Sequence, residues 1–560
     1  MTQAQQVLLL TDFTAQPLVT ALARLDGRPQ LEGKSGPFDR AMEVLNDGKA
    51  PCWAEAPDFA FVWTAPEKIV PSLGAGGMAD RAALDRDFDL FADALAEAAG
   101  RVKALFFAAW SMAPWQRGLG PLDLRGGKAH GLMHLNTRLL ETAQSLPNVY
   151  VLDAPRWLAA SGQAGWDNRS WYLSKVPFTT PVYQTAAREL QAAAAAVLGL
   201  RRKLLILDLD DTLWGGTVGE DGWRNLRLGG HDPVGEALAD FQRDLKTLAA
   251  QGVMLALVSK NTEAVALEAI DSHPEMLLKR SDFVGWRINW QDKADNIAEL
   301  VAELNIGLDA VVFIDNDRAE RDRVRQALPD VLVPEWPEDK ASYAKALQSL
   351  TCFDALTLSH EDGQRTRMYV EDRQRQDILK TASSKQDWLA LLELQAEITL
   401  LGSADLPRAA QLLNKTNQMN LTTRRLGEDQ LMRWAQEQGR KFYVVRVKDR
   451  LGDYGLTGLL GLEMNGSEAS LADFVLSCRV IGRGVEQALL HAASQVASQA
   501  GCKTLIARFV PTERNQPCKS LFESDANFTA SGGADLEFRH DLNKAYPKPL
   551  HVELNWIGQP

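Results

Sequence analysis

A short apolar run that ends in carboxylates is the feature that most constrains the fold of this 560-residue chain. Residues 204–207 read Leu-Leu-Ile-Leu, and Asp208 and Asp210 follow at once. Four consecutive aliphatic residues indicate a strand of a parallel sheet that is covered on both faces. Ligands of open α/β sheets bind at the carboxyl ends of the strands, so the run predicts a site there. Asp208 can attack a phosphoryl group and Asp210 can protonate the leaving oxygen, while Mg²⁺ offsets the repulsion between phosphate and carboxylate.

Further strand ends distinguish this hypothesis from a solvated turn rich in aspartate. The apolar run 253–258 ends in Ser259, whose hydroxyl can hold a phosphate oxygen, and Asn261 follows closely. Lys293 stands between a predicted strand, residues 283–288, and a predicted helix. Its ammonium can neutralise both the phosphate and the charged nucleophile.

A third acid follows another predicted strand. Residues 311–314 read Val-Val-Phe-Ile and lead into Asp315, Asn316 and Asp317. Carboxylate oxygens at such a position suit Mg²⁺, which takes hard oxygen ligands and keeps several waters.

These four motifs, in this order, resemble those of the haloacid dehalogenase (HAD) superfamily of aspartyl-phosphate enzymes. The resemblance implies the following roles: Asp208 as nucleophile, Asp210 as general acid and base, Thr212, Ser259, Asn261 and Lys293 in orienting the loop and binding phosphate, and Asp208, Asp210 and Asp315 as magnesium ligands. Many members have a second acid where this chain has Asn316. Either Asp317 replaces that acid or the affinity for the metal is weaker.

The segments between these motifs are too short to hold a folded cap above the site. We therefore expect an open site, which suits a bulky substrate or closure by another domain of the chain, because phosphoryl transfer requires positioning and control of water.

Length and composition indicate a multidomain globular protein. A chain of 560 residues suggests three or four domains, and a hydrophobic content of 46% is ordinary for such proteins. The net charge of −12 argues against a general nucleic-acid binder. No segment approaches the ~20 apolar residues of a membrane span and the N-terminus has no basic region, so we expect no membrane partner and a cytoplasmic location. The five cysteines have no CxxC spacing, which argues against a disulfide framework and a zinc site.

Residues 1–200 predict a separate α/β domain. Apolar runs alternate there with helical stretches, with strands expected at residues 7–10, 59–63, 105–110 and 149–152 and helices at 88–99 and 185–197. This layout, with its Leu10-Thr11-Asp12-Phe13 start, resembles the SGNH-hydrolase fold, in which a serine follows the first strand and an Asp-x-x-His pair completes a triad.

The residues at the catalytic positions of that fold do not match. Thr11 and Asp12 stand where Gly-Asp-Ser is expected, and Asp167-Asn-Arg-Ser170 lacks the histidine. We interpret the domain as a degenerate scaffold or docking module in preference to an esterase, and the aromatic residues of 166–172 as packing or interface.

After residue 337 the chain becomes strongly charged. Residues 361–376 carry acids and bases at i, i+4 spacing, which predicts a solvated connecting helix. The alternative is a helix that positions a third domain over the open site.

The segment 472–500 is the second strong signal. A predicted strand ends at Cys478, and Arg479-Val-Ile-Gly482-Arg483-Gly484 leads into a long apolar helix. Backbone N–H groups of a glycine-rich loop at a helix N-terminus form an anion site. The loop resembles the pyrophosphate loop of GNAT-type acyltransferases, which hold coenzyme A there, and the downstream segments 504–509 and 515–528 resemble the next GNAT elements.

Cys478 would lie at this strand end, beside Arg479 and the helix N-terminus. Such surroundings lower the pKa of a thiol and favour the nucleophilic thiolate. The alternative is a buried cysteine that is merely apolar.

A HAD domain followed by a GNAT-like domain, with the segments 414–423 and 477–484, resembles the FkbH-like family. Its members are best known in polyketide pathways, where they take 1,3-bisphosphoglycerate, remove phosphate and load the three-carbon unit as a thioester on an acyl carrier protein. The resemblance implies that Cys478 carries the acyl unit. It also implies that the phosphopantetheine of the carrier is held by Arg479, Gly482, Arg483 and Gly484.

The polar segment 414–423 has two interpretations of equal weight. Either it lines the acceptor cleft, with Asn414, Thr416, Asn417 and Asn420 as its contacts, or it is a packed helix cap. Arg424 and Arg425 either face an acidic helix of the carrier or lie on an ordinary surface.

The sequence thus predicts an α/β, multidomain protein: an SGNH-like domain (1–200), a capless HAD-like parallel sheet (201–337), a helical connector (338–394) and a GNAT-like α+β domain (395–560). The predicted function is Mg²⁺-dependent removal of phosphate from a phosphorylated three-carbon donor and transfer of its glyceryl or hydroxyacyl unit to an acyl carrier protein. One alternative is a plain phosphatase with the GNAT-like domain as a substrate-selecting lid. The other is a non-catalytic assembly scaffold.

Overall fold

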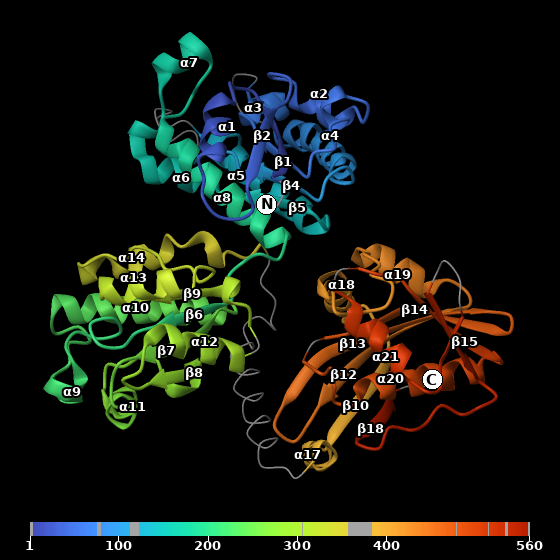
Figure 1. The fold of residues 1–560 in the computed structure, drawn as a ribbon. Helices are drawn as coiled ribbons and strands as arrows, with labels where there is room; N and C mark the ends of the chain where they lie inside the picture. The colour runs from blue at the N-terminus through green and yellow to red at the C-terminus, as the bar shows by residue number, and fades with distance from the viewer. Residues whose placement is uncertain are drawn as a thin grey trace. The chain divides into compact units, whose positions relative to one another are not determined.

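The computed structural model describes residues 4–74, 80–112, 122–304, 306–356, 384–477, 479–512, 514–531 and 536–557. The chain forms two compact units, Met1–Thr366 and Arg367–Pro560. The first unit contains a five-stranded and a four-stranded sheet, and the second contains a nine-stranded sheet (Figure 1). The predicted fold class, α/β with several domains, is confirmed. The charged segment 361–376 lies outside the described residues.

The five-stranded sheet is entirely parallel, in the order β2 (Leu31–Ser35), β1 (Gln5–Thr11), β3 (Phe59–Trp63), β4 (Ala104–Ala108), β5 (Val149–Leu152). Four of these strands are the predicted ones. Strand β2 was not predicted, because this edge strand reads Leu-Glu-Gly-Lys-Ser and only Leu31 is buried.

Helices cover both faces of this first sheet. Successive residues of a strand point to opposite faces, so Leu8 and Leu10 pack with one set of helices and Val7 and Leu9 with the other. The first set is α2 (Ala41–Asn46), α4 (Arg81–Ala99) and α5 (Lys128–Ser145), and the second is α1 (Gln16–Ala23), α6 (Ala154–Ser161) and α8 (Thr180–Val197). Two short helices, α3 (Pro66–Ile69) and α7 (Asn168–Ser174), also lie in this part of the chain.

The four-stranded sheet is also parallel, in the order β8 (Phe283–Ile288), β7 (Met254–Ser259), β6 (Leu204–Leu207), β9 (Val311–Ile314). One face packs against α10 (Pro233–Ala250), α11 (Glu263–Ser272) and α14 (Tyr343–Gln348). Helix α12 (Lys293–Glu303) contacts β7, β8 and α13 (Arg318–Ala327). Between β6 and α10 the chain forms only the four-residue helix α9 (Val218–Asp221) and a 3-10 turn, so this segment holds no folded cap.

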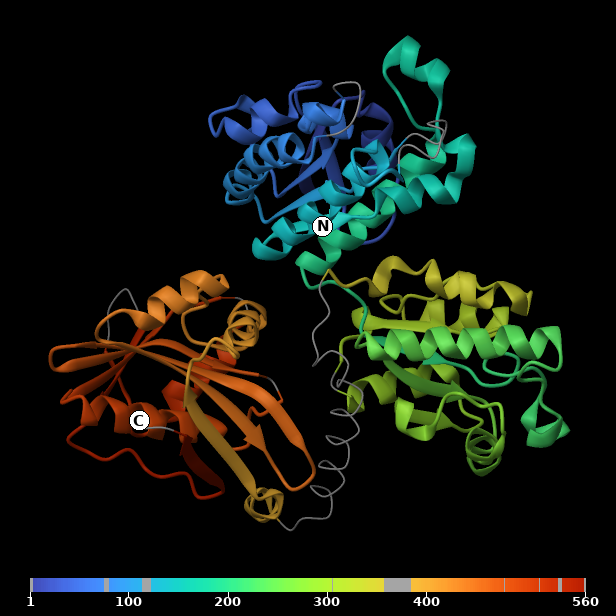
Figure 2. The ribbon, with the colours of Figure 1, turned by 180° about the vertical axis from the view of Figure 1, so that it is seen from behind.

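The third sheet is mixed, in the order β16 (Thr529–Ser531), β17 (Leu536–Asp541), β15 (Thr504–Phe509), β14 (Glu468–Leu476), β13 (Asp453–Asn465), β12 (Arg440–Lys448), β10 (Leu394–Leu400), β18 (Val552–Ile557). The ninth strand, β11 (Met419–Asn420), pairs with β14. Figure 2 shows these strands, orange to red, as one curved sheet.

Helices cover both faces of this sheet as well. Helices α17 (Lys385–Leu392), α20 (Val485–Gln499) and α21 (Gln516–Ser524) share the larger core with Tyr443 and Val445. Helices α18 (Leu406–Lys415) and α19 (Glu428–Gln436) share the smaller core with Phe442 and Val444, on the opposite face. In the part of the chain that the structure describes, no helix has the length and apolar character needed to cross a membrane.

Candidate functional site

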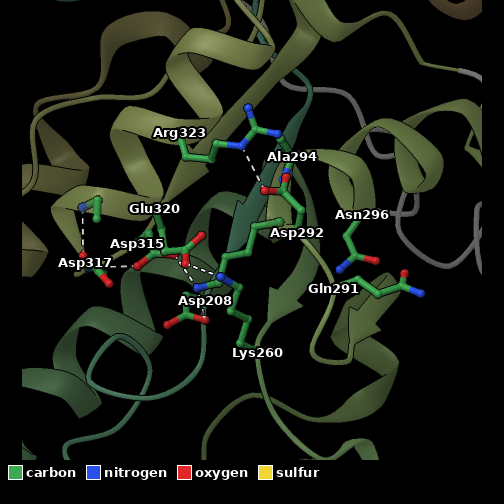
Figure 3. Close-up of polar contacts among 12 residues, drawn as sticks. Asp208, Lys260, Gln291, Asp292, Ala294, Asn296, Asp315, Asp317, Glu320 and Arg323 are labelled. Atoms are coloured by element: carbon green, nitrogen blue, oxygen red, sulfur yellow. Dashed lines mark hydrogen bonds and ion pairs between the residues drawn. The ribbon is translucent and has the colours of Figure 1, made fainter.

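The ends of β6 and β9 bring two carboxylates together. These neighbouring strands pair Leu207 with Ile314, so Asp208 and Asp315 are the first residues beyond the same edge of the sheet. Both are buried, at 5% and 0% exposure. The Nζ of Lys293 lies 2.9 Å from Oδ1 of Asp208 and 2.6 Å from Oδ2 of Asp315. Figure 3 shows the contacts converging between the two carboxylates.

Lys293 reaches this position because it opens helix α12. Asp292 caps the helix, and its carboxylate accepts a hydrogen bond of 2.9 Å from the backbone N–H of Ala294. The other Asp292 oxygen accepts from Nε of Arg323 at 2.9 Å (Figure 3). The cap therefore fixes the backbone from which the buried Lys293 side chain extends.

Asp210 is held by the loop that follows it. Its Oδ1 accepts from the indole N–H of Trp214 at 2.9 Å and from the backbone N–H of Val218 at 3.0 Å, and its Oδ2 accepts from the amide of Asn261 at 2.9 Å. Burial raises the pKa of this carboxyl; the first two bonds oppose the rise, and the charge of Asp208 adds to it. A raised pKa suits a group that both gives and takes a proton.

The charges of the site do not balance. Burial alone would lower the pKa of the Lys293 ammonium, but the charges of Asp208 and Asp315 outweigh burial and raise it. The pKa of Asp315 is raised to about 6, chiefly by burial and by the charge of Asp208, against the opposing effect of Lys293. One ammonium thus faces two buried carboxylates, with Asp210 nearby.

This donor set fits Mg²⁺. Among the described residues no group of three or more His, Cys, Asp or Glu side chains is already assembled to hold a metal ion. Asp208 and Asp315 nevertheless offer hard oxygen donors with surplus negative charge, and Mg²⁺ keeps several waters in place of protein ligands. These two residues would hold the ion. The side chain of Asp210 is engaged in three hydrogen bonds, and its role as a ligand stays a prediction.

Thr212 and Ser259 are buried at the same edge. Ser259 ends strand β7 and is 2% exposed, and Thr212 is fully buried. The Thr212 hydroxyl lies 3.3 Å from Oδ1 of Asn316, to which it donates. Asn316, the departure from the HAD pattern, therefore ties the loop after Asp210 to the loop after Asp315. The phosphate-binding roles of Thr212, Ser259, Asn261 and Lys293 stay predictions.

Sequence reasoning missed two residues that shape the site. Trp214 holds Asp210, and its position four residues beyond that acid was the only signal. Arg321, 5% exposed, donates from one guanidinium N–H group to the backbone oxygens of Asp315 and Asn316, at 2.8 and 2.9 Å. Helix α13 contains many charged residues, so the sequence did not distinguish Arg321 from its neighbours.

The glycine loop before α20 differs from expectation in its contacts. Gly482 and Gly484 have φ of 79° and 86°, a left-handed conformation that glycine adopts without strain. The N–H of Gly482 donates to the carboxylate of Glu486, so the anion at this helix N-terminus is a side chain from the first turn of α20 itself. Arg483 is buried and donates to the hydroxyl of Tyr454. Cys478 lies outside the described residues, and the pantetheine-binding roles of Arg479, Gly482, Arg483 and Gly484 stay predictions.

Segment 414–423 is arranged as a packed helix end. Asn420, fully buried, donates to the backbone oxygen of Thr416 at 3.1 Å, just beyond α18. Asn414 donates to the backbone oxygen of Leu426, and Asn417 accepts from Arg425. Contacts of Asn414, Thr416, Asn417 and Asn420 with an acceptor stay a prediction.

Arg424 is turned inward, whereas Arg425 lies exposed at the surface, and contact of either residue with a carrier stays a prediction. Arg424 forms an ion pair with the fully buried Asp473 and lies over the ring of Trp434. Arg425 donates to the backbone oxygen of Leu413. Both guanidinium groups satisfy groups of the domain itself, because a buried carboxylate and the open carbonyls of a helix end require partners.

We expect Arg424→Leu to destabilise the third domain by about 3–5 kcal/mol, because it leaves Asp473 buried without its counter-ion. Thermal unfolding of the full chain measures the change. The double variant with Asp473→Leu should recover most of the loss. Equal melting of the single and double variants would contradict this account of the pair.

In the first domain, the residues at the SGNH positions serve packing. Phe13 stands where the serine is expected and packs against the ring of Trp63 with centroids 5.2 Å apart. Asp167 caps α7, accepting a bond of 2.9 Å from the backbone N–H of Ser170. Neither residue contacts a histidine among the described residues, as expected if the triad is absent. The interpretation as a degenerate module stays a prediction.

Comparisons with known proteins bear on the class of fold. No protein-family model matches the sequence, and no protein of curated function matches it. The N-terminal part of the protein BF1531 from Bacteroides fragilis, containing a phosphatase domain complexed with Mg, is similar: the TM-score is 0.58, identity is 28%, and the match covers 63% of this chain and 95% of that one.

Two acetyltransferases also match, each over about a quarter of this chain. The ribosomal-protein-S18-alanine N-acetyltransferase from Escherichia coli has a TM-score of 0.20 and 16% identity over 26% of this chain and 90% of its own. Spermidine N-acetyltransferase from Vibrio cholerae, in complex with CoA and spermine, has a TM-score of 0.21 and 18% identity over 26% and 93%. Membership of the FkbH-like family stays a prediction.

Proposed function

We propose that this chain is a Mg²⁺-dependent HAD-type enzyme that removes phosphate from a phosphorylated three-carbon donor, 1,3-bisphosphoglycerate or a similar compound. The bridge from Lys293 to Asp208 and Asp315 is the observation that carries the proposal. The similarity to a phosphatase domain complexed with Mg supports it.

In the phosphoryl step, a carboxylate oxygen of Asp208 attacks the phosphorus of the donor's phosphate ester, not that of its acyl phosphate, and the bond from phosphorus to the ester oxygen breaks. Asp210 gives its proton to that oxygen. Water then attacks the phosphorus of the aspartyl-phosphate and gives a proton to Asp210, which restores both acids and releases phosphate. Lys293 holds Asp208 in place and offsets negative charge throughout. A bound Mg²⁺ would supply further charge neutralisation.

The finer proposal adds acyl transfer by the third domain. The Cys478 thiolate attacks the acyl carbon of an acyl phosphate, the bond from that carbon to the phosphate oxygen breaks, and a glyceryl or related hydroxyacyl thioester forms. The phosphopantetheine thiol of an acyl carrier protein then takes the acyl unit and gives its proton to Cys478. The sequence supports this assignment, because Cys478 precedes helix α20 by only a short loop and the N-terminus of a helix stabilises a thiolate beside it.

A plain phosphatase is the second candidate, and one observation favours it. Glu486 already accepts the hydrogen bond from the Gly482 N–H, where a phosphate of the pantetheine arm would bind. In that case the third domain selects the substrate without reacting with it. A scaffold without activity would release no phosphate from any donor.

The intact mass of the full chain after incubation with Mg²⁺ and 1,3-bisphosphoglycerate, with and without a phosphopantetheinylated carrier, separates these functions. The proposal predicts a glyceryl adduct on the enzyme that passes to the carrier. The adduct should be absent in Cys478→Ala and present in the control variant Cys52→Ala. Phosphate release at the wild-type rate by Cys478→Ala, with no adduct on either protein, would leave a plain phosphatase.

A further inference from the structure

A cavity of about 230 Å³ lies in the first domain, at the carboxyl ends of two neighbouring strands. Asp12 directly follows β1 and Thr64 directly follows β3, and both residues line the cavity. Parallel strands end at one edge of their sheet, and this edge is where open α/β sheets bind ligands. The cavity belongs to the first domain alone, because all the described residues that line it fall between Asp12 and Phe178.

One oxygen of the Asp12 carboxylate is available to a ligand. Asp12 is 7% exposed, and its Oδ2 accepts a hydrogen bond of 3.0 Å from the backbone N–H of Ala65. Its Oδ1 accepts from no other described residue. This oxygen is also not one of the described side-chain atoms that lie sealed from solvent without a partner, so it keeps accessible surface. Because Asp12 lines the cavity, we infer that a ligand there can donate to Oδ1.

The charge of Asp12 has no counter-ion among the described residues around it. Lys128, which also lines the cavity, forms an ion pair with Glu67. Lys68, whose charge reaches Asp12, pairs with Asp39 at 2.6 Å. Burial raises the pKa of the Asp12 carboxyl, a backbone hydrogen bond opposes the rise, and the charge of Asp39 adds to it. Buried charges in proteins are normally paired, so this edge of the sheet carries one surplus negative charge.

Aromatic side chains surround this surplus charge. Six of them line the cavity: Phe13, Trp63, Trp110, Trp166, Trp171 and Phe178. The face of an aromatic ring attracts a cation, most strongly where water is excluded. Lys175 already contacts the ring of Trp171 in this way, with its Nζ 4.8 Å from the ring centroid. Aromatic walls also favour an apolar molecular body. A cation with an apolar body therefore suits both the walls and Asp12.

The cavity admits only a compact molecule. Its volume of about 230 Å³ is below the range of about 300–1,000 Å³ that is usual for pockets of drug-sized ligands. Its rim consists of the lining residues that remain partly exposed, among them Met112, Trp166, Asn168 and Trp171. A ligand can therefore enter from solvent, but a long chain such as a phosphopantetheine arm does not fit inside.

We propose that this cavity binds a small organic cation, an ammonium group on a compact apolar body. The ammonium donates to Oδ1 of Asp12 and supplies the missing positive charge, while the aromatic side chains contact the apolar body. A neutral or anionic molecule of the same shape lacks this ion pair. The N-terminal domain is then an amine-binding module, and its ligand differs in chemical class from the phosphorylated donor proposed for the Asp208 site.

Three probes with the same ring test the class of ligand on the full chain: phenethylamine, phenylacetamide and phenylacetate. Isothermal titration calorimetry should show saturable binding of the amine, at least about tenfold tighter than that of either other probe, which is the effect of one charge-assisted hydrogen bond. The amine should also raise the melting temperature, because it binds the folded chain. Binding of the amide or the acetate at least as tight as that of the amine, or no saturable binding of the amine, would overturn the proposal.

Asp12→Asn tests the carboxylate itself. The amide of asparagine keeps an oxygen that can accept from the Ala65 N–H but carries no charge. Affinity for the amine should fall at least about tenfold. Without ligand, the variant should melt no lower than the wild type, because the substitution removes an unpaired buried charge. Unchanged amine affinity in folded Asp12→Asn would overturn the proposal.

Asp58→Asn is the matched control. Oδ2 of Asp58 also accepts from a backbone N–H, that of Gln6 at 2.8 Å. Asp58 precedes β3, at the opposite edge of the same sheet, and is not among the described residues that line the cavity. Both variants change the net charge of the chain equally, so the control measures any non-specific attraction of the amine to an acidic protein. Amine affinity should equal that of the wild type, and an equal loss in both variants would contradict binding at Asp12.

Discussion

Asp208→Asn should abolish Mg²⁺-dependent phosphate release, with a loss of roughly a thousandfold or more, as expected when the nucleophile of a covalent mechanism is removed. The amide is nearly isosteric and still accepts a hydrogen bond from Lys293, which keeps its ion pair with Asp315. The variant should therefore melt no lower than the wild type. A colorimetric phosphate assay across a panel of phosphorylated three-carbon acids measures the loss.

Asp317→Asn is the matched control for this substitution. Asp317 was the candidate to replace the acid missing at position 316, but its carboxylate caps α13 by accepting from the backbone N–H of Ala319 at 2.8 Å, a role that asparagine fills equally well. We expect phosphate release near the wild-type rate. Equal activity in Asp208→Asn and Asp317→Asn would show that the reaction does not proceed through Asp208.

Lys293→Ala should lower both stability and phosphate release. It removes the one ammonium between two buried carboxylates, and breaking a buried ion pair costs about 3–5 kcal/mol. For a domain of this size the melting transition should fall by roughly 10 °C. Differential scanning calorimetry of the full chain measures the shift, and the same phosphate assay measures the activity.

Lys260→Ala provides the comparison. Lys260 follows Ser259 and pairs with Glu320, but its side chain is 40% exposed (Figure 3). An exposed pair contributes only about 0–1 kcal/mol, so the melting transition should shift by no more than about 4 °C. If both variants melted alike, Lys293 would not hold the two carboxylates together in solution.

The strands that carry the site could be predicted because they are buried on both faces. Residues 283–288 and 311–314 match β8 and β9 to the residue, and the apolar run at 204–207 is β6. Asp208 and Asp315 each follow an aliphatic run directly. The end of the buried run marks the end of the strand, and this places the acid at the edge of the sheet. Strand β2 carried no such signal, since an edge strand buries little of its surface.

The contacts within the loops could not be predicted, because they depend on which groups meet across the fold. Thr212 was predicted to orient its loop, but its partner Asn316 lies 104 residues further on. Paired arginines usually lie on the surface, but Arg424 forms an ion pair with the buried Asp473. The residue pattern of the strand that contains Asp473 does not show that this carboxylate is buried and needs a cation. Glu486 follows the glycine loop directly, and the sequence does not show that its carboxylate turns back onto Gly482.

The most direct test of the central claim is chemical trapping of the phosphoryl group on Asp208. The full chain is mixed with Mg²⁺ and 1,3-bisphosphoglycerate, quenched rapidly, reduced with borohydride and mapped by peptide mass spectrometry. The account predicts homoserine at position 208, dependent on Mg²⁺ and absent in Asp208→Asn. Rapid phosphate release with an unmodified Asp208 at every quench time would contradict it.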